Sequence, residues 1–232
     1  MPLRPLPITI AGPHGPLPAL AAGDPRTARA GVVLGHGMSA TMHVQWPQAE
    51  RLATAGYAVI IPEMPHHGLR ADGYLDRMAG QPDEVTRPLF LDMVEECVAE
   101  LPSHVEHLVR AGARRVVCAG FSIAGYIALA APARDPRVDL VVAFMADPVW
   151  DGRAASPHLR PEAFDGKGLF AVTGDDDEVV PPGPLRAFVR DLAERSGDAE
   201  RFAHVRYRGG HMMDPADWDD AWGRAIAWLN VR

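Results

Sequence analysis

The chain has 232 residues, 47% hydrophobic and 23% charged, a balance that predicts one soluble globular domain over residues 1–232 with a sizeable core. Its net charge is −7 and its basic residues are scattered, which excludes a surface that follows the phosphates of nucleic acid. No apolar run approaches the roughly 20 residues of a membrane helix, and the proline-rich start lacks the apolar core of a secretory signal, so we expect a cytoplasmic protein without a membrane partner.

Short apolar runs alternate with helical patterns from one end of the chain to the other. The first two runs lie in a Pro- and Gly-rich opening, residues 1–27, which predicts a hairpin at the edge of a sheet. In chain order, the predicted strands are 8–10, 17–22, 31–34, 57–61, 116–118, 138–145, 169–173 and 202–207. The predicted helices are about 46–55, 83–110, 123–131, 184–196 and 215–230.

Two segments depart from this simple alternation. Residues 63–82 are rich in Pro, Gly and His, and we expect them to form a loop. The helical pattern over 83–110 carries Pro88 and Pro102, which are expected to kink or split it because proline lacks the amide hydrogen that a helix uses.

The central apolar runs are hydrophobic at successive positions rather than at alternate ones. Strands of this kind are buried on both faces, as in a parallel sheet that helices cover on each side. The fold class we expect is therefore α/β, with a doubly wound, mostly parallel sheet of about eight strands. Only residues 146–168 separate two of the later strands, which leaves room for a short flap and little or no cap domain.

The two cysteines, Cys97 and Cys118, are too few for a disulfide framework or a zinc cluster. Cys118 as a nucleophile is the sharper alternative, but it lies inside a predicted strand, whereas a reactive thiolate needs exposure and an activating partner. We expect both to be buried thiols. The acidic run 175–178 lacks a histidine or further carboxylate spaced to complete a metal site, so neither a metal nor another cofactor is expected.

A serine follows the predicted strand 116–118 in the segment Gly-Phe-Ser-Ile-Ala-Gly. A sharp strand-to-helix turn at Ser122 requires small residues two positions before and two positions after it, and Gly120 and Ala124 satisfy this. The same pattern also occurs in ordinary loop serines, so by itself it does not decide between the two interpretations.

Two further loops supply partners for that serine, because the loops beyond the carboxyl ends of parallel strands gather functional groups at one edge of the sheet. Asp177 follows the strand 169–173, and His211 follows the strand 202–207. A serine hydroxyl becomes a nucleophile when a histidine takes its proton and a carboxylate orients that histidine. Asp147, just beyond the strand 138–145, is the competing position for the acid.

From roughly residue 28 onward the sequence resembles the α/β-hydrolase family. The segments that carry the resemblance are Leu-Gly-His-Gly at 34–37, Gly-Phe-Ser-Ile-Ala-Gly at 120–125, Gly-Asp-Asp-Asp-Glu-Val-Val-Pro at 174–181 and Gly-Gly-His at 209–211. Within the family the chain is similar to small bacterial carboxylesterases related to dienelactone hydrolases and to the prolyl-oligopeptidase catalytic domain. Residues 61–70 are similar to their loop of Pro-Asp-x-x-x-His-Gly-x-Arg type. True dienelactone hydrolases carry cysteine at the position of Ser122, so this serine argues against dienelactone as the substrate.

The resemblance also implies residue roles. It selects Asp177 as the acid, and it implies that the backbone amide of Met38 stabilises an oxyanion together with that of Ile123, at the start of the next helix. His36 is expected to brace its loop, and His67 either braces its own loop or contacts substrate. Side chains in or beside the active loops that are expected to line a substrate pocket are Phe121, Met42, Met64, His67, Trp150 and Met212.

The function expected is hydrolysis of small to medium carboxylic esters through an acyl-enzyme on Ser122. Thioesterase, lactonase and peptidase activities use the same groups and stay open. A non-catalytic binding protein on a hydrolase scaffold is an alternative from a different class, against which the intact set of Ser122, Asp177 and His211 argues. The expected partner is a small-molecule ester, and both a monomer and a homodimer are compatible with exposed edge strands near the N-terminus.

Overall fold

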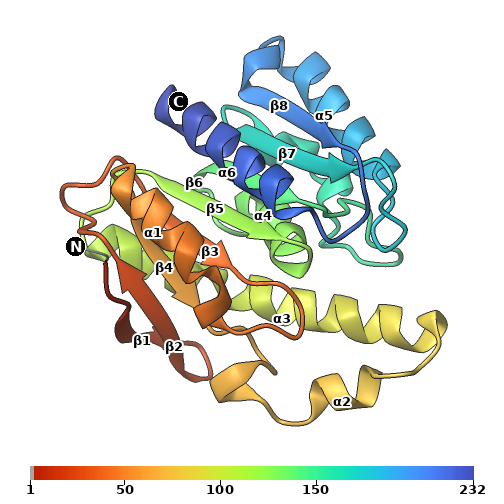
Figure 1. The fold of residues 1–232 in the computed structure, drawn as a ribbon, viewed down its shortest axis with the longest axis horizontal. Coiled ribbons are helices and arrows are strands. Elements are labelled where there is room, and N and C mark those ends of the chain that lie inside the picture. The colour runs from red at the N-terminus through yellow and green to blue at the C-terminus, as the bar shows by residue number, and fades with distance from the viewer. Residues whose placement is uncertain (1–2) are drawn as a thin grey trace. The chain divides into compact units, whose positions relative to one another are not determined.

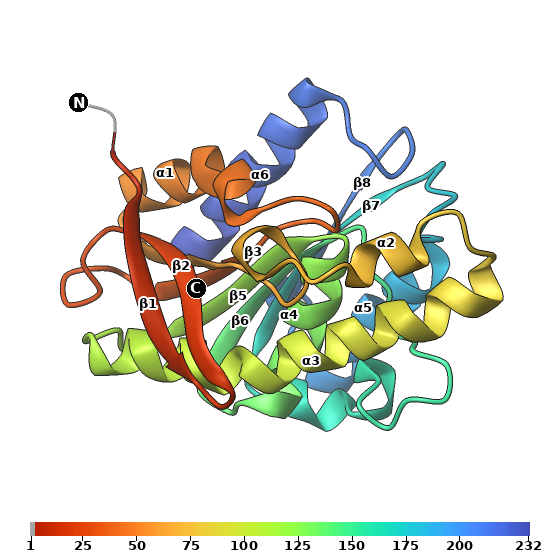
Figure 2. The ribbon, with the colours of Figure 1, turned by 90° about the horizontal axis from the view of Figure 1, so that it is seen from below.

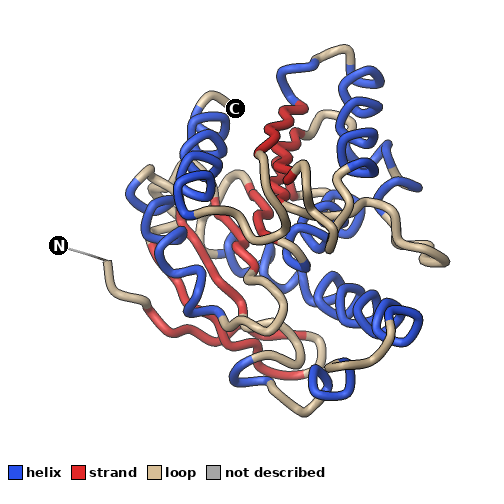
Figure 3. The backbone as a smooth tube through the Cα atoms, turned by 45° about the vertical axis from the view of Figure 1, so that its right-hand side comes forward, coloured by secondary structure: helices blue, strands red, loops and turns tan. Residues whose placement is uncertain are grey.

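The computed structural model describes residues 3–232, so Met1 and Pro2 of the predicted opening lie outside the described residues. It has an eight-stranded sheet, and its residues group into two compact units that meet in sequence at Val116 and Val117. Helices, blue in Figure 3, alternate with the strands, red, along both units.

The first unit is built on four strands. They are β1 (Leu6–Gly12), β2 (Gly15–Ala22), β3 (Gly31–Gly35) and β4 (Ala58–Pro62). Their order is β1-β2-β4-β3, in which β1 with β2 and β2 with β4 are antiparallel and β3 with β4 is parallel. The hairpin of β1 and β2 closes tightly, since its register pairs Gly12 with Gly15.

The helices of this unit lie around those strands. They are α1 (Trp46–Thr54), α2 (Tyr74–Met78) and α3 (Asp83–Arg110), with single-turn 3-10 helices η1 (Met42–Gln45) and η2 (Gly68–Arg70). Figure 2 shows α1 and α3 on opposite faces of the strands. Residues 63–82 were expected to form a loop only, but η2 and α2 lie within them. Burial of Tyr74 and Met78 stabilises α2 despite the flanking glycines.

The long helix α3 continues through both of its prolines. Pro88 and Pro102 each remove one amide hydrogen from the helix, yet α3 is one element of 28 residues (Figure 1), and the expectation that they split it is wrong. Its buried face runs from Leu91 to Leu108 and includes Val105, so it extends to both sides of Pro102. That packing outweighs the hydrogen bond lost at Pro102, whereas Pro88 lies in the less buried first turns of the helix.

The second unit contains the other four strands, in the order β5-β6-β7-β8. They are β5 (Val116–Phe121), β6 (Val138–Phe144), β7 (Gly168–Gly174) and β8 (Phe202–Tyr207). β6 with β7 and β7 with β8 are parallel. The helices are α4 (Ile123–Arg134), α5 (Gly183–Ser196) and α6 (Pro215–Asn230), with 3-10 turns η3 (Pro157–Leu159), η4 (Pro161–Phe164) and η5 (Ala199–Arg201).

Helices cover both faces of these four strands, with α6 on one face and α4 and α5 on the other (Figure 2). Every residue of β7 is buried, as the run of successive apolar positions predicts. The mostly parallel sheet of eight strands between helices confirms the predicted α/β fold class. Between β6 and β7 only η3 and η4 occur, so there is no large cap. Across residues 3–232, no helix combines the length and the apolar character that crossing a membrane requires.

Candidate active site

Ser122 lies at a sharp turn between the end of β5 and the start of α4. Its backbone has φ of 56° and ψ of −125°, a region that a non-glycine residue occupies only at a cost in energy. Its amide donates to the carbonyl oxygen of Phe144 at 2.9 Å, which anchors the turn to β6. The turn therefore holds the hydroxyl group at the end of the strand.

Small neighbours make this turn possible, as the sequence pattern predicts. A Cβ added at Gly120 would lie 2.3 Å from Cβ of Ala124, and one added at Gly125 would lie 2.8 Å from Cβ of Ala146. Both distances are shorter than real Cβ contacts allow. The strand and the helix approach each other closely enough to exclude any larger side chain at these two positions.

The three predicted triad residues lie in contact. His211 Nε2 is 3.0 Å from Ser122 Oγ, and His211 Nδ1 is 2.9 Å from Asp177 Oδ2. Because the Asp177 carboxylate accepts, Nδ1 of the neutral imidazole carries the proton and Nε2 is free to accept the serine hydrogen. The Asp177 side chain is 1% exposed and that of His211 is 12% exposed. The contacts form a continuous chain from hydroxyl to imidazole to carboxylate.

Asp177 and His211 lie on two loops that are tied to each other. The Asp175 amide donates to the carbonyl oxygen of Tyr207 at 2.8 Å, and that of Asp176 donates to the carbonyl oxygen of Gly209 at 3.0 Å. Asp177 Oδ1 accepts the amides of Val179 and Val180, at 3.0 and 2.8 Å. These bonds leave Oδ2 facing His211.

The neighbouring carboxylates are engaged elsewhere. Asp175 pairs with Arg206 and Arg186, and the hydrogen bond from Arg206 lowers the pKa of Asp175 below its usual value. Asp147, the competing position for the acid, accepts the amide of Val149 at 2.8 Å through its Oδ1. Of these carboxylates, Asp177 is the one that contacts His211.

Aromatic rings support the imidazole from the side of α6. The rings of Phe121 and His211 have centroids 5.0 Å apart, and Trp218 packs edge-on against Phe121 at 5.5 Å. Trp218 in turn contacts Phe144 in β6 at 5.8 Å. Phe121, at the end of β5, therefore flanks His211 and is itself supported by Trp218 of α6, whose other two tryptophans are buried.

The predicted oxyanion donors lie on different units. Ile123 begins α4, where the first helical hydrogen bond runs from the Tyr126 amide to the carbonyl oxygen of Ser122 at 3.1 Å. The amide of Ile123 precedes that bond and has no partner within the helix, as at the start of every helix. Met38 lies in the first unit, between β3 and η1, and is 45% exposed. Its role stays a prediction.

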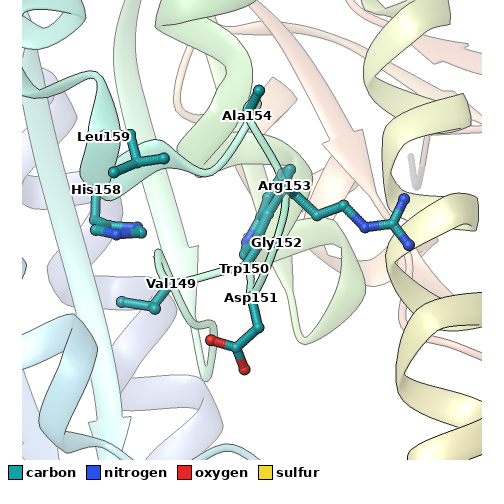
Figure 4. Close-up of a pocket in the computed structure, with 8 residues that line it drawn as sticks. All are labelled: Val149, Trp150, Asp151, Gly152, Arg153, Ala154, His158 and Leu159. Atoms are coloured by element: carbon teal, nitrogen blue, oxygen red, sulfur yellow. The ribbon is translucent and has the colours of Figure 1, made fainter.

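The predicted pocket residues differ in exposure. Phe121 is partly buried beside His211, and Met212 is exposed, whereas the remaining four are buried: Met42, Met64, His67 and Trp150. Trp150 lines a cavity of about 420 Å³ in the segment after β6, shown in Figure 4 with Val149, Asp151, Gly152, Arg153, Ala154, His158 and Leu159. The indole of Trp150 stacks near Tyr126 of α4, with ring centroids 6.3 Å apart.

Both cysteines are buried, as predicted. Burial raises the pKa of the Cys97 and Cys118 thiols well above the usual value. A thiol of this kind stays protonated near neutral pH and is a poor nucleophile. Among residues 3–232, no cluster of three or more His, Cys, Asp or Glu side chains is arranged to hold a metal ion.

Glu63 is a buried carboxylate that the sequence reasoning did not single out. It is 1% exposed and stands where the related family loop has Asp after Pro, a signal by which it could have been found. Burial alone would raise the pKa of Glu63, but contacts with His36 and with the amides of Met42 and Leu69 outweigh burial and lower that pKa. The group is therefore an ionised carboxylate inside the first unit.

A model of the alpha/beta hydrolase family matches residues 32–231, and the chain belongs to this family. This membership confirms the predicted resemblance and defines an enzyme of hydrolase type. None of the curated proteins matches the chain.

Similar solved structures share the fold. A putative dienelactone hydrolase from Klebsiella pneumoniae has a TM-score of 0.74 at 18% identity, with 98% of each chain covered. The esterase Pf2001 from Pyrococcus furiosus has a TM-score of 0.71 at 16% identity, covering 98% of this chain and 92% of that one. A thermophilic esterase from Thermogutta terrifontis has a TM-score of 0.69 at 17% identity, covering 97% and 93%.

Proposed function

We propose that this α/β hydrolase is a serine carboxylesterase in which Ser122 is the nucleophile, His211 the base and Asp177 the acid. The observation that carries the proposal is the unbroken chain of contacts from Ser122 Oγ through His211 to Asp177 Oδ2, at 3.0 and 2.9 Å. These distances lie within the reach that proton transfer from a serine to its base requires.

The reaction follows from this geometry. His211 Nε2 takes the Ser122 proton as Oγ attacks the ester carbonyl, and the buried Asp177 stabilises the imidazolium that forms. His211 then protonates the departing alcohol, which leaves an acyl group on Oγ. A water molecule, deprotonated by His211, attacks the acyl carbon, and the carboxylic acid departs as Oγ regains its proton.

Negative charge on the carbonyl oxygen needs hydrogen-bond donors that are already in place. The Ile123 amide, at the N-terminus of the 12-residue helix α4, is one such donor, and the helix dipole adds to it. By family likeness, the Met38 amide is the second. Loss of one donor of this type typically costs about 3 kcal/mol of transition-state stabilisation.

Two features favour small to medium esters. The segment between β6 and β7 has only short 3-10 turns, so no large cap covers the site. Structures described as esterases are also among the similar folds. Thioesters, lactones and peptides would use the same three side chains and differ in the leaving group alone.

The alternative of a non-catalytic binding protein is disfavoured by the backbone at Ser122. A left-handed conformation of this kind costs about 1–3 kcal/mol in a non-glycine residue and persists where function requires it. A scaffold released from catalysis has no use for this strain.

The direct test is labelling and mutation of the nucleophile. A fluorophosphonate probe should label Ser122, and Ser122→Ala should abolish hydrolysis of p-nitrophenyl acetate, because the atom that forms the acyl-enzyme is removed. Ser196→Ala, a change at an exposed serine near the end of α5, should leave both signals unchanged. Folded wild-type protein that is inert to the probe and to the ester would favour the binding protein.

A further inference from the structure

The first unit holds a buried cluster of titratable side chains that the proposed mechanism does not use. Glu63 and His67 are each 1% exposed, and His36 is 0% exposed. His36 belongs to the loop that follows β3, residues 36–42, and Glu63 and His67 belong to the loop that follows β4, residues 63–70. The three side chains meet where these loops pack together. Burying such groups is unfavourable unless they are paired, so their contacts indicate what the cluster does.

The carboxylate of Glu63 joins the two loops. Its Oε1 accepts the amide of Met42 at 3.0 Å, on the first loop, and its Oε2 accepts the amide of Leu69 at 3.3 Å, on the second. Oε1 also lies 3.2 Å from His36 Nε2. One side chain therefore supplies acceptors to both loops at once.

The second loop is shaped around this carboxylate. Gly68 has φ of +44°, and a Cβ added there would lie 2.1 Å from Glu63 Oε2. The guanidinium of Arg70 donates to the Glu63 carbonyl oxygen at 3.1 Å and is itself held by Glu100 on α3. Position 68 thus requires glycine because the Glu63 side chain fills the adjoining space.

His67 holds the first loop at a second point. Its Nδ1 donates to the carbonyl oxygen of Pro65 at 2.7 Å, which leaves the lone pair of Nε2 to accept the amide of Ser39 at 3.2 Å. Burial lowers the pKa of His67 and so favours the neutral form that this acceptor role needs. The ring also packs edge-on against His36, with centroids 5.0 Å apart.

The segment held in this way is strained. Ser39 has φ of 61°, which for serine is unfavourable by about 1–3 kcal/mol and needs support from the surroundings. Its neighbour is Met38, the residue whose amide we assign to the oxyanion. The contacts at Ser39 and Met42 therefore fix the chain after that amide, and the contact of His36 with Glu63 fixes it before.

We propose that Glu63 and His67 are positioning residues for ester hydrolysis, which hold residues 37–42 in the conformation that presents the Met38 amide to the oxyanion. This inference rests on the proposed serine esterase function. A donor held in place before reaction stabilises the transition state without reorganisation, whereas the ground-state ester gains little from it. The two residues should therefore act on kcat more than on KM.

Glu63→Gln is the sharpest variant, because it keeps the shape but replaces one acceptor oxygen by a donor. Only one of the Met42 and Leu69 amides then retains its acceptor. We expect kcat for p-nitrophenyl acetate to fall about 10- to 100-fold, short of the complete loss of an oxyanion donor, with KM within about twofold of wild type. His67→Gln leaves Glu63 in place, removes the imidazole acceptor of the Ser39 amide, and should lower kcat about tenfold.

A readout specific to the oxyanion separates positioning from general destabilisation. A trifluoromethyl ketone adds Ser122 Oγ to its carbonyl and carries the negative charge of the tetrahedral intermediate. Its affinity should fall in parallel with kcat/KM in both variants. Asp135→Asn is the matched control, since Asp135 is also a buried carboxylate that accepts a backbone amide, from Arg137 at 3.0 Å. It lies at the far end of α4 from Ser122, so it should lower stability and leave kcat unchanged.

Folded Glu63→Gln and His67→Gln proteins with wild-type kcat would overturn the proposal, as would an unchanged affinity for the ketone. A loss of kcat in Asp135→Asn as large as that in Glu63→Gln would also overturn it. In each of these cases Ser122 would still be labelled and the wild-type protein would still hydrolyse the ester, so the proposed function would stand. Wild-type protein inert to both probe and ester would instead remove the proposed function itself.

Discussion

Ser122 shows how single residues carry the chemistry of this chain. Its left-handed backbone depends on two small neighbours, Gly120 and Ala124. The turn forms only where the strand and the helix approach closely, and a larger side chain at either position would prevent this. The contact with His211 then places a proton acceptor beside the hydroxyl group that the turn presents. At this scale, two substitutions test whether the geometry has the role we assign to it.

The first substitution concerns the acid. Asp177→Asn should lower kcat by about 10³- to 10⁴-fold, because an amide can hold His211 in the wrong tautomer and cannot stabilise the imidazolium. Asp147→Asn should have a far smaller effect, since its Oδ1 bonds the amide of Val149. Steady-state hydrolysis of p-nitrophenyl acetate by the two purified variants measures the difference. The reverse ranking would show that the acid follows β6.

The second substitution concerns the close approach of β5 and α4 at the turn that carries Ser122. Gly120→Ala places a methyl group 2.3 Å from Cβ of Ala124, and the backbone must move to relieve the clash. We expect the free energy of unfolding to fall by about 1–3 kcal/mol and esterase activity to fall with it, as measured by denaturant titration and ester hydrolysis. Gly183→Ala is the control, because nothing lies within 4 Å of a Cβ at that position. Equal stability of the two variants would contradict the steric argument.

At the scale of elements, α3 shows that packing can outweigh local helix preferences. Two prolines fail to divide its 28 residues, and apolar side chains from Leu91 to Leu108 are buried on both sides of Pro102. The same packing buries His104, whose Nε2 has no hydrogen-bond partner in the part of the chain that the structure describes. Burial lowers the pKa of His104 to about 3. A buried neutral histidine makes the stability of the fold depend on pH.

The sign of that dependence follows from proton uptake. Below the usual histidine pKa of about 6.5, the unfolded chain binds a proton at His104, whereas the folded chain does not until the pH approaches about 3. The contribution of His104 to stability is therefore complete above pH 6.5. It decreases as the pH falls toward 3, by at most about 1.4 kcal/mol per pH unit.

His104→Leu should remove this loss. We expect the free energy of unfolding of the variant to decline less steeply than that of wild type between about pH 6.5 and pH 4, measured by urea titration at each pH. His43→Leu, a change at an exposed histidine, controls for the general effect of replacing histidine by leucine. Parallel curves for wild type and His104→Leu would show that His104 is not the group responsible.

For the whole molecule, the predicted pattern of strands and helices agrees with the structure because it depends on local properties. A run of successive apolar residues such as 169–173 is buried on both faces wherever it is placed, and β7 is buried throughout. The presence of proline and glycine is a weaker local guide to secondary structure. They led us to expect only a loop over 63–82, where burial of Tyr74 and Met78 stabilises α2.

The candidate site depends both on the local sequence and on contacts between residues far apart in the chain. The types, spacing and order of Ser122, Asp177 and His211 are legible in the sequence, since each follows its own strand and the chemistry requires these three groups. Which of the neighbouring carboxylates contacts His211 is decided by hydrogen bonds between loops, such as that from Asp176 to Gly209. Contacts between residues far apart in the chain leave no local pattern.

Sequence alone therefore determined the α/β class, the hydrolase resemblance and the three candidate catalytic side chains, because hydrophobic periodicity and motif chemistry are local. Only the tertiary structure revealed the cluster of His36, Glu63 and His67. A carboxylate in a loop is ordinarily exposed to water, and Glu63 is buried because two loops pack around it and offer it their amides. Whether a polar side chain faces solvent or holds a loop in place is decided by that packing.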